Sequence, residues 1–446
     1  MHDAPVMSTQ TPSPMSDANR LPPSLWAASA IAGPVCPPLD GDTRCDVAVV
    51  GAGFTGLTTA LAAVEAGASV IVLEASEPGW GASGRNGGQV NAGVKISPSE
   101  VVSKFGKEAG DKLNTFVGGS ADVVFSLVEK HKIDCEARRG GLLFCVAQKG
   151  ELESQRSICI DWAARGAAVR WADEEETSDL TGAHGYLGAM ADMRCGRVQP
   201  LSYARGLAHA ALKAGARICG NTAATGLSSE NGRWKVSTPH GAVYARKVIL
   251  ATNGYSGFHA SGLSPKLDRS IIPIASFIIA TEPLSDNLRH SILPHGHCTA
   301  DTRRFLYYTS VDAAGRLVFG GRGLLRDPRD AQDFAHLQAG IAAVFPQAKD
   351  VQIAFRWSGR IALTLDKIPH LHEPEPGLLM ALGYNGRGVA AGSALGTAIG
   401  QYAVTGDAST LPLPVSTLAP IQFHGLRAPF MAAAFSWQIF IDKIVK

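Results

Sequence analysis

Residues 46–56 read Asp46-Val47-Ala48-Val49-Val50-Gly51-Ala52-Gly53-Phe54-Thr55-Gly56 and decide the fold of the chain. The first five form a short, β-branched run, which predicts a buried strand. The glycines that follow predict a tight turn that opens a helix over about 54–67. Gly51 permits the turn, Gly53 lets the backbone approach a pyrophosphate, and Gly56 lets the helix pack closely on the strand. The helix N-terminus then offers N–H groups and partial positive charge to phosphates.

A second strand is predicted over residues 69–73, and it ends at Glu74. A strand, a helix and a parallel strand make a βαβ unit, which predicts a doubly wound sheet. In such folds an acidic residue roughly 20 positions after the first glycine binds ribose hydroxyls and disfavours a 2′-phosphate. The motif therefore predicts a dinucleotide site and argues against NADP. The alternative is a glycine-rich turn without a ligand.

Composition narrows the class of protein. The 446 residues include 41 Lys+Arg and 39 Asp+Glu, for a net charge of +2, and 46% are hydrophobic. This balance excludes a disordered chain and argues against a nucleic-acid partner. Neither a secretory signal nor a run of about 20 apolar residues is visible. The eight cysteines form no C-x-x-C pair, so we expect reduced thiols in a cytoplasmic protein.

Three further stretches carry a resemblance to a known family. Residues 81–90 read GASGRNGGQV, residues 249–254 read ILATNG, and residues 383–389 read GYNGRGV. They resemble the flavin-contacting loop, strand end and C-terminal turn of the D-amino-acid-oxidase-like family of FAD-dependent oxidoreductases. The lead-in SLW at 24–26 and the GASGRNGGQ loop are most similar to the gamma-glutamylputrescine oxidoreductase branch. The resemblance extends from about residue 22 to residue 410.

The resemblance implies an α/β fold in which a Rossmann-type FAD-binding domain is interleaved with a β-rich substrate domain. The FAD-binding domain is expected at 41–100, 198–260 and 358–410, and the substrate domain at 101–197 and 261–357. We expect residues 1–40 to be extended or disordered, with Trp26 packed on the body. Residues 411–446 are expected to form a C-terminal tail with an amphipathic helix from Pro429, which packs on the body or contacts a membrane surface.

The same resemblance indicates which residues hold FAD. Glycines among residues 81–88 let the backbone lie flat against a planar ring, and the helix start after Asn385 offers N–H groups to negative charge. An ordinary flexible loop and a solvated Arg387 are the alternatives. The expected cofactor-binding residues are Gly51, Gly53, Phe54, Thr55, Gly56, Glu74, Ala82, Ser83, Arg85, Asn86, Gly87, Gly88, Thr252, Asn253, Gly254, Gly359, Gly386, Arg387, Gly388 and Val389.

Attachment of the flavin is expected to be noncovalent. Some relatives attach it through His or Cys, whereas the corresponding loop here carries Arg85 and Asn86, and the strand at 303–310 has no Cys. Cys298 is the nearby thiol, and we expect it to be buried. No metal site is expected, because the His295/His297 and His370/His372 pairs lack an evident third ligand.

The segment from Trp357 to Pro369 resembles the one that crosses the substrate cavity in this family. In amino-acid-oxidising relatives an arginine there binds the substrate carboxylate, and the corresponding residue here is Ile361. Because strand residues alternate in direction, Arg360 is expected to face away from that position. This favours an amine without an adjacent carboxylate, unless a cation from elsewhere replaces the arginine, for instance Arg85, Arg304 or Arg322.

The predicted function is oxidation of the C–N bond of a small amine, similar to gamma-glutamylputrescine. A hydride would pass to the flavin, the imine would hydrolyse to an aldehyde, and O2 or another acceptor would reoxidise the flavin, with H2O2 as the product from O2. No catalytic residue is assigned; Arg360, Tyr308 and Asn385 are substrate-cavity candidates. The alternatives are an oxidase or dehydrogenase of glycine, sarcosine or proline, and a non-catalytic FAD-binding subunit. The oligomeric state stays open.

Overall fold

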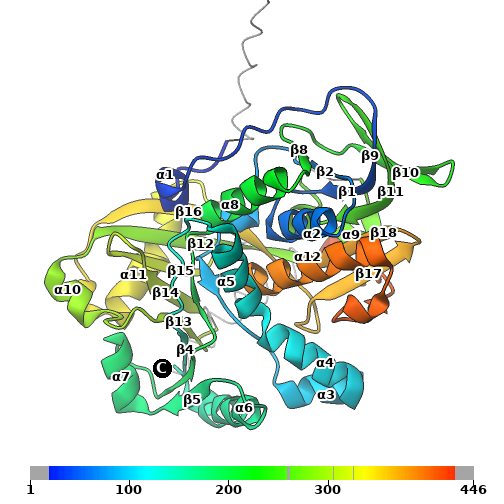
Figure 1. Cartoon of the computed structure of the whole chain (residues 1–446). Coiled ribbons are helices and arrows are strands. Elements are labelled where there is room, and N and C mark those ends of the chain that lie inside the picture. The colour runs from blue at the N-terminus through cyan, green and yellow to red at the C-terminus, as the bar shows by residue number, and fades with distance from the viewer. Residues whose placement is uncertain (1–19, 259–261, 305, 325, 427–446) are drawn as a thin grey trace, which may run out of the picture.

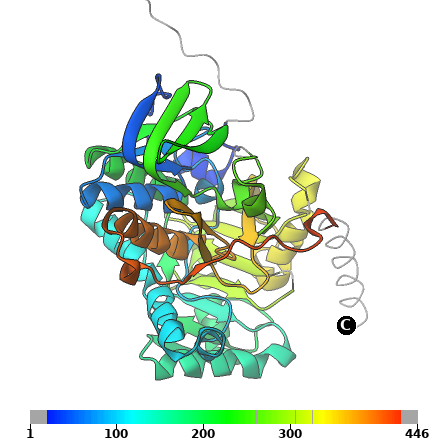
Figure 2. The same ribbon diagram turned by 90° about the vertical axis from the view of Figure 1, so that its right-hand side faces the viewer.

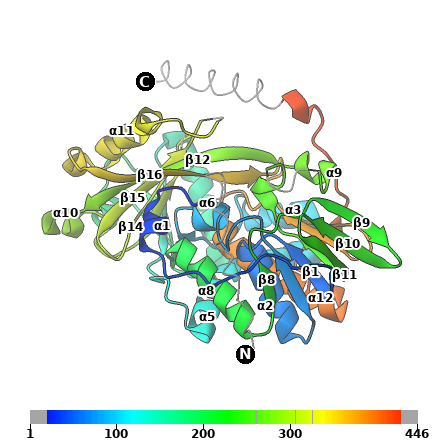
Figure 3. The same ribbon diagram turned by 90° about the horizontal axis from the view of Figure 1, so that it is seen from above.

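The structure is a computed structural model, and it describes residues 20–258, 262–304, 306–324 and 326–426. Two large sheets lie side by side, with helices around them (Figures 1 and 3). The nine-stranded sheet runs in the order β19 (Val415–Ser416), β17 (His370–Glu375), β18 (Leu378–Leu382), β11 (Gly241–Leu250), β1 (Thr43–Val50), β2 (Val70–Leu73) and β8 (Arg217–Cys219), with β10 (Arg233–Thr238) beside β11 and β9 (Gly226–Glu230) beside β10.

The strands around β1 form the predicted doubly wound arrangement. β1 pairs in parallel with β2 and with β11, and β11 pairs in parallel with β18. Every residue of β2 is buried, as is typical of a parallel strand covered on both faces. Helix α2 (Phe54–Glu65) connects β1 to β2, so the βαβ unit predicted from residues 46–74 is confirmed.

Helix α12 (Gly388–Thr405) packs directly on α2. A Cβ on Gly396 would lie 2.4 Å from the Thr55 carbonyl oxygen, and one on Gly400 would lie 2.5 Å from the Thr59 carbonyl oxygen. The Thr59 hydroxyl donates to the Gly396 carbonyl at 3.0 Å. Only glycine permits so close a contact, and it brings together two helices that lie more than 300 positions apart in the sequence.

The eight-stranded sheet has different helices on its two faces. Phe277 and Ile279 pack beside α11 (Ala335–Val344), whereas Ile278 and Ala280 pack against α1 (Leu25–Ser29), as strand alternation requires. The order of strands is β16 (Ile353–Leu363), β12 (Ile272–Pro283), β15 (Arg316–Arg322), β14 (Tyr307–Val311), β13 (Cys298–Asp301), β4 (Leu142–Cys145), β6 (Ala189–Asp192) and β5 (Val169–Ala172).

The helical pattern predicted over 97–131 is confirmed as α3 (Pro98–Phe105), α4 (Lys107–Gly118) and α5 (Ser120–His131). Together with α6 (Leu152–Ala164), α3 and α4 gather at one end of the molecule (Figure 2). The hairpin predicted at Asn231-Gly232 is also confirmed, because both residues have the positive φ that this turn needs. The remaining elements are α7 (Glu174–Thr181), α8 (Pro200–Lys213), α9 (Pro265–Asp268), α10 (Asp286–Ser291), and the ribbon of β3 (Gln89–Val90) and β7 (Gly196–Arg197).

One expected boundary and one expected segment can be compared with the observed elements. The expected domain boundary at 358 falls inside β16, which pairs with β12 along its length. Helix α5, from the expected substrate portion, packs on α12 and α8. Within the segment expected to be extended, residues 25–29 form a helix that the Ser24 hydroxyl caps, and Trp26 is buried as predicted. The division into domains stays a prediction.

The expectations for the two ends of the chain concern residues that the structure does not describe. Residues 1–19 and the amphipathic helix expected from Pro429 lie outside the described residues. Within the described ranges, no helix combines the length and the apolar character needed to cross a membrane.

All eight cysteines are unpaired thiols, as expected.

Candidate active site

A cavity of about 570 Å³ is lined by residues of both large sheets. It lies at the carboxyl ends of β1, β2 and β11, where ligands bind in doubly wound sheets. The expected cofactor-binding residues all line it, apart from Gly56 and Gly88, and so do the substrate-cavity candidates Arg360, Tyr308 and Asn385. Segments that are far apart in the sequence therefore meet at one site.

The turn after β1 has the geometry predicted from its glycines. Gly51 has a φ of 103°, and its N–H donates to the Leu73 carbonyl at 2.8 Å. Gly53 precedes α2 without a side-chain cap, and the Phe54 N–H donates to the Ser83 hydroxyl at 2.9 Å. Gly56 lies behind the turn, where a Cβ would be 1.9 Å from the Gly51 carbonyl oxygen. The N-terminus of α2 thus stays open to an anion in the cavity.

Glu74 ties the end of β2 to this turn. Its carboxylate accepts hydrogen bonds from the Ala52 N–H at 2.7 Å and the Ser76 N–H at 3.0 Å. Burial raises the pKa of Glu74, and the backbone hydrogen bonds act in the opposite direction. The residue lines the cavity. Glu74 is therefore bonded to the turn and lines the cavity, and its binding to a ribose stays a prediction.

The glycine-rich loop at 81–88 is held by its own side chains. The Asn86 amide donates to the carbonyls of Ala82 at 3.1 Å and Ser83 at 2.9 Å, and its oxygen accepts from the Gly88 N–H at 2.8 Å. These bonds disfavour the alternative of an ordinary flexible loop. A Cβ on Gly87 would lie 2.5 Å from the ring of Tyr308, so only glycine allows that ring to pack on the loop.

The turn before α12 uses Asn385 for its own geometry. Asn385 has a φ of 52°, and its amide oxygen accepts from the Thr364 N–H at 3.0 Å. Its amide nitrogen donates to the Thr364 hydroxyl at 3.0 Å and to the Gly383 carbonyl. With these partners, Asn385 shapes the turn rather than offering its amide to a substrate, which changes the role expected for it.

Arg387 is the N-cap position of α12, but its side chain does not cap the helix. The guanidinium instead donates to the Ala92 carbonyl, and burial lowers the pKa of Arg387. These contacts disfavour the alternative of a solvated surface residue. The first N–H groups of α12 are thereby left for an anion or a polar edge in the cavity.

Arg360 and Ile361 both contribute to the lining of the cavity, so the expectation that the Arg360 side chain faces away from the position of Ile361 stays a prediction. β16 is the edge strand of its sheet. The Arg360 guanidinium bonds the Asp327 carboxylate at 2.8 Å and lies 4.6 Å from the centre of the Phe258 ring. Its charge therefore already has a protein partner.

Lys95 is the main cavity residue that the sequence did not indicate. Its ammonium has no hydrogen-bond or ion-pair partner in the part of the chain that the structure describes, and a Cβ on Gly386 would lie 4.0 Å from its Nζ. Lys95 is exposed to solvent, and partial desolvation by the surrounding protein, together with the charges of Arg387, Lys367 and Arg322, lowers the pKa of Lys95 to about 8. A single lysine in an irregular segment, between Val94 and Ile96, gave no pattern by which to find it.

The part of the cavity lined by β4, β6 and α6 is mainly apolar. Leu142 and Phe144 come from β4, Ile158 and Trp162 from α6, and Met190 from β6. Two carboxylates also line this region, and each has an arginine partner: Asp192 with Arg194 and Asp301 with Arg303. These strands and α6 were placed in the substrate portion from the sequence, but their convergence on one wall was not predicted.

The histidine pairs have partners within the protein. His370 Nε2 lies 3.0 Å from the Asp366 carboxylate, and His297 Nδ1 contacts the Gly140 carbonyl. Among the described residues no three His, Cys, Asp or Glu side chains gather as a metal site would require.

Comparison with protein families identifies the family of the chain. The model of the family described as FAD dependent oxidoreductase (DAO) matches residues 46–402. The chain belongs to this family. FAD is accordingly its cofactor, and the chain is an oxidoreductase, which sets aside the alternative of a non-catalytic subunit. The residues of the cavity fit FAD, because the N-termini of α2 and α12, whose N-cap side chains form no cap, the Glu74 carboxylate and a glycine-rich loop line one space.

Individual members of the family are similar over most of the chain. Gamma-glutamylputrescine oxidoreductase of Escherichia coli is 32% identical, over 94% of this chain and 98% of that protein. Probable oxidoreductase OrdL of Haemophilus influenzae is 32% identical, over 88% of each chain. The crystal structure of glycine oxidase from Geobacillus kaustophilus has a TM-score of 0.69 at 21% identity, over 87% of this chain and 98% of that chain, which shows the shared fold.

We expect this DAO-family protein to be yellow when purified and to release intact FAD on heat or acid denaturation. No cysteine or histidine of the described residues lines the cavity, and Cys298 is buried in β13. The supernatant of the denatured protein, separated by chromatography, provides the measurement. Yellow colour retained in the precipitate would show a covalent link, and release of FMN would contradict the role of Glu74 at an adenosine ribose.

Proposed function

We propose that this protein oxidises the C–N bond of a small amine similar to gamma-glutamylputrescine. The observation that carries the proposal is that Ile361 lines the cavity. Apolar side chains of β4, β6 and α6 line the same cavity. An aliphatic amine chain gains from burial against such a wall, whereas a carboxylate needs a cation there. The similarity to the enzyme of Escherichia coli over nearly the whole chain supports the same substrate class.

The residues that would hold FAD follow from the geometry. Gly51, Gly53 and the N-terminus of α2 would hold the pyrophosphate, Glu74 would hold the ribose, and residues 81–87 with the N-terminus of α12 would contact the ring. Bound FAD supplies the acceptor for a hydride from the α-carbon of the amine, and the resulting imine hydrolyses to an aldehyde. The chain contributes orientation and exclusion of water, with Tyr308 packed on Gly87 and bonded to the Ser276 hydroxyl at 3.0 Å.

A second candidate function is oxidation of an amino acid such as glycine, sarcosine or proline. Lys95 supports it, because an ammonium without a partner among the described residues offers a cation in place of the arginine that Ile361 replaces, although the same ammonium could bind the remote carboxylate of gamma-glutamylputrescine. Arg85, which was expected as one replacement, lies 4.2 Å from the centre of the Trp80 ring and donates to the Trp80 carbonyl at 2.8 Å. The cation for a carboxylate would then come from the segment after β3 rather than from β16.

An anaerobic substrate panel tests the two candidates. Gamma-glutamylputrescine, putrescine, glycine, sarcosine, D-alanine and proline are mixed with the holoenzyme at equal concentration, and the flavin absorbance is followed. We expect the diamine derivatives to reduce the flavin faster than any amino acid. Equal or faster reduction by glycine or sarcosine would favour the second function. Admission of O2 and a peroxide assay then test O2 as the acceptor and H2O2 as the product.

Lys95→Met should separate the substrates by their charge. A substrate whose carboxylate meets Lys95 should bind at least tenfold more weakly to the variant, because a hydrogen bond to a charged group contributes about 1.5–3 kcal/mol. Putrescine, which has no carboxylate, should be unaffected. Since the pKa of Lys95 is lowered to about 8, the ammonium is charged below pH 8 and neutral above it. Binding of such a substrate to the wild type should therefore weaken as pH rises through 8, and the pH dependence should vanish in Lys95→Met.

We also propose that the protein acts in the cytoplasm. The support is chemical: all eight cysteines are thiols, and none is paired. Disulfides are rare where thiols are kept reduced. Fractionation of cells that express the protein, followed by detection with an antibody, tests the location.

A further inference from the structure

The segment before β1 meets the glycine-rich loop through indole groups. Trp26 Nε1 donates to the Asn86 carbonyl at 2.7 Å, and Trp357 Nε1 donates to the neighbouring Arg85 carbonyl at 3.0 Å. In return, Trp80 Nε1 donates to the Arg20 carbonyl at 3.0 Å. Two successive peptide carbonyls of the loop are thus held by two buried tryptophans, which are 3% and 2% exposed.

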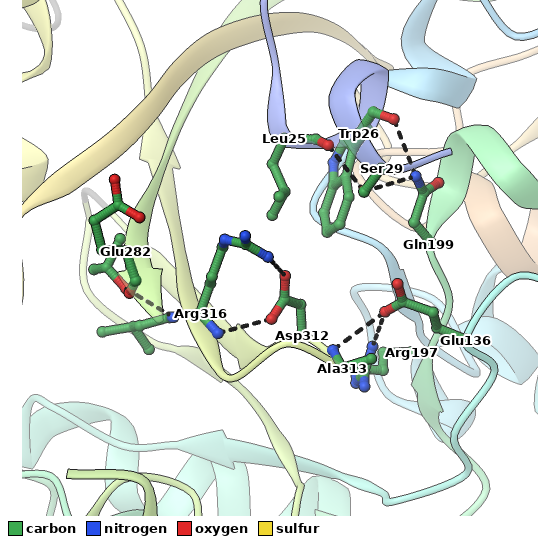
Figure 4. Close-up of polar contacts among 12 residues, drawn as sticks. Leu25, Trp26, Ser29, Glu136, Arg197, Gln199, Glu282, Asp312, Ala313 and Arg316 are labelled. Carbon is green, nitrogen blue, oxygen red and sulfur yellow. Dashed lines mark hydrogen bonds and ion pairs between the residues drawn. The ribbon is translucent and has the colours of Figure 1, made fainter. Parts of the chain in front are cut away.

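Trp26 is itself fixed from several sides. The Ser24 hydroxyl caps α1, and Trp26 packs edge-on against Trp357, with ring centroids 5.8 Å apart. The Gln199 amide donates to the Trp26 carbonyl at 3.0 Å and to the Ser29 hydroxyl at 3.2 Å, as Figure 4 shows. The indole N–H therefore meets the loop from a rigid support rather than from a loose chain end.

The two carbonyl bonds also determine where the next N–H groups point. In a trans peptide the C=O and the following N–H point in opposite directions. Fixing the Arg85 carbonyl therefore fixes the Asn86 N–H, and fixing the Asn86 carbonyl fixes the Gly87 N–H. Neither N–H has a hydrogen-bond partner among the described residues, and both Asn86 and Gly87 line the cavity. The tryptophans thus hold two donors on the side of the loop away from the indoles.

We propose that Trp26, together with Trp357, is a positioning residue of the FAD site. It orients the peptide units of residues 85–87 so that their N–H groups face the flavin. The segment before β1 then contributes to cofactor binding, although it lies outside the dinucleotide-binding motif and does not line the cavity. The inference rests on the proposed placement of the flavin ring along residues 81–87.

The test compares Trp26→Phe and Trp357→Phe with Trp234→Phe. Phenylalanine keeps an aromatic ring and removes only the N–H and part of the ring. Trp234 is the matched control, because it is 7% exposed and its Nε1 donates to the Pro376 carbonyl at 3.1 Å, on a strand away from the loop. We expect FAD to bind roughly three- to tenfold more weakly to the first two variants and unchanged to the control. The visible circular dichroism of the bound flavin should change in the first two only.

A second variant guards against a folding defect. Gln199→Met keeps a side chain of similar length without placing a charge at this buried position, and it removes the amide donor to the Trp26 carbonyl. It should shift FAD affinity and flavin dichroism in the same direction as Trp26→Phe, without loss of the folded apoprotein.

Ser83→Ala tests the placement of FAD separately from the positioning role of Trp26. Ser83 lines the cavity, and its hydroxyl accepts a hydrogen bond from the N-terminus of α2. If Ser83→Ala weakens FAD binding while Trp26→Phe matches the Trp234 control, the positioning role is refuted and the placement of FAD stands. If neither variant changes FAD binding or dichroism, the placement itself is wrong.

Discussion

Gly56→Ala is expected to abolish FAD binding and to lower the stability of the protein. The new Cβ would lie 1.9 Å from the Gly51 carbonyl oxygen and 3.2 Å from a methyl group of Val49. The first neighbour is backbone of the turn itself, so relief of the clash must displace the turn and the N-terminus of α2. Overpacking of a well-packed site typically costs 1–3 kcal/mol, and a contact with backbone places this variant at about 3 kcal/mol or more.

The ratio of flavin absorbance to protein absorbance and the midpoint of thermal unfolding measure both effects. Gly150→Ala is the control, since a Cβ there has no neighbour within 4 Å and its backbone is not left-handed. It should retain FAD and the unfolding midpoint of the wild type. A Gly56→Ala protein with a full complement of FAD would contradict the packing derived for the turn.

Glu74→Ala should weaken FAD binding about ten- to hundredfold. The carboxylate is expected to hold the ribose, and hydrogen bonds to charged groups contribute about 1.5–3 kcal/mol. Its removal also leaves the N–H groups of Ala52 and Ser76 without their acceptor, so the turn loses its link to β2. Titration of the apoprotein with FAD, followed by fluorescence quenching, gives the dissociation constant.

Glu77→Ala is the matched control for this experiment. Glu77 lies three positions further on and pairs with Arg205 at 3.0 Å, but it does not line the cavity. Its removal should leave the affinity for FAD unchanged. Glu74→Gln, which keeps one carbonyl acceptor, should fall between Glu74→Ala and the wild type. An unchanged dissociation constant in Glu74→Ala would make Glu74 a support of the turn without a role at the ribose.

The parts of the fold that local patterns encode were predictable. β2 is apolar throughout, and Asn231-Gly232 fits one turn type, so short windows suffice for both. β6 and β13 were not predictable, because Ala189–Asp192 and Cys298–Asp301 lack β-branched runs and become strands by pairing with β4. Their conformation is a property of the neighbouring strand.

At the site, too, only the features that one short segment encodes could be predicted from the sequence. The glycines and Glu74 were found because a phosphate-binding turn constrains spacing within one segment. Lys95 and the tryptophan contacts were not found, because each depends on which residues the folded chain brings near. Asn385 was identified as a candidate for chemistry, but its amide bonds Thr364, a partner 21 positions earlier that only the β16–α12 arrangement supplies.

The contact between α2 and α12 has a consequence for how the enzyme matures in the cell. Residues 51–56 leave the ribosome early, whereas the glycines of α12 follow more than 300 residues later. At about 5–20 residues per second, the phosphate-binding turn waits on the order of tens of seconds for the helix that completes its surroundings. We therefore expect FAD to bind after α12 has packed on α2, and until then the face of α2 that α12 covers is exposed.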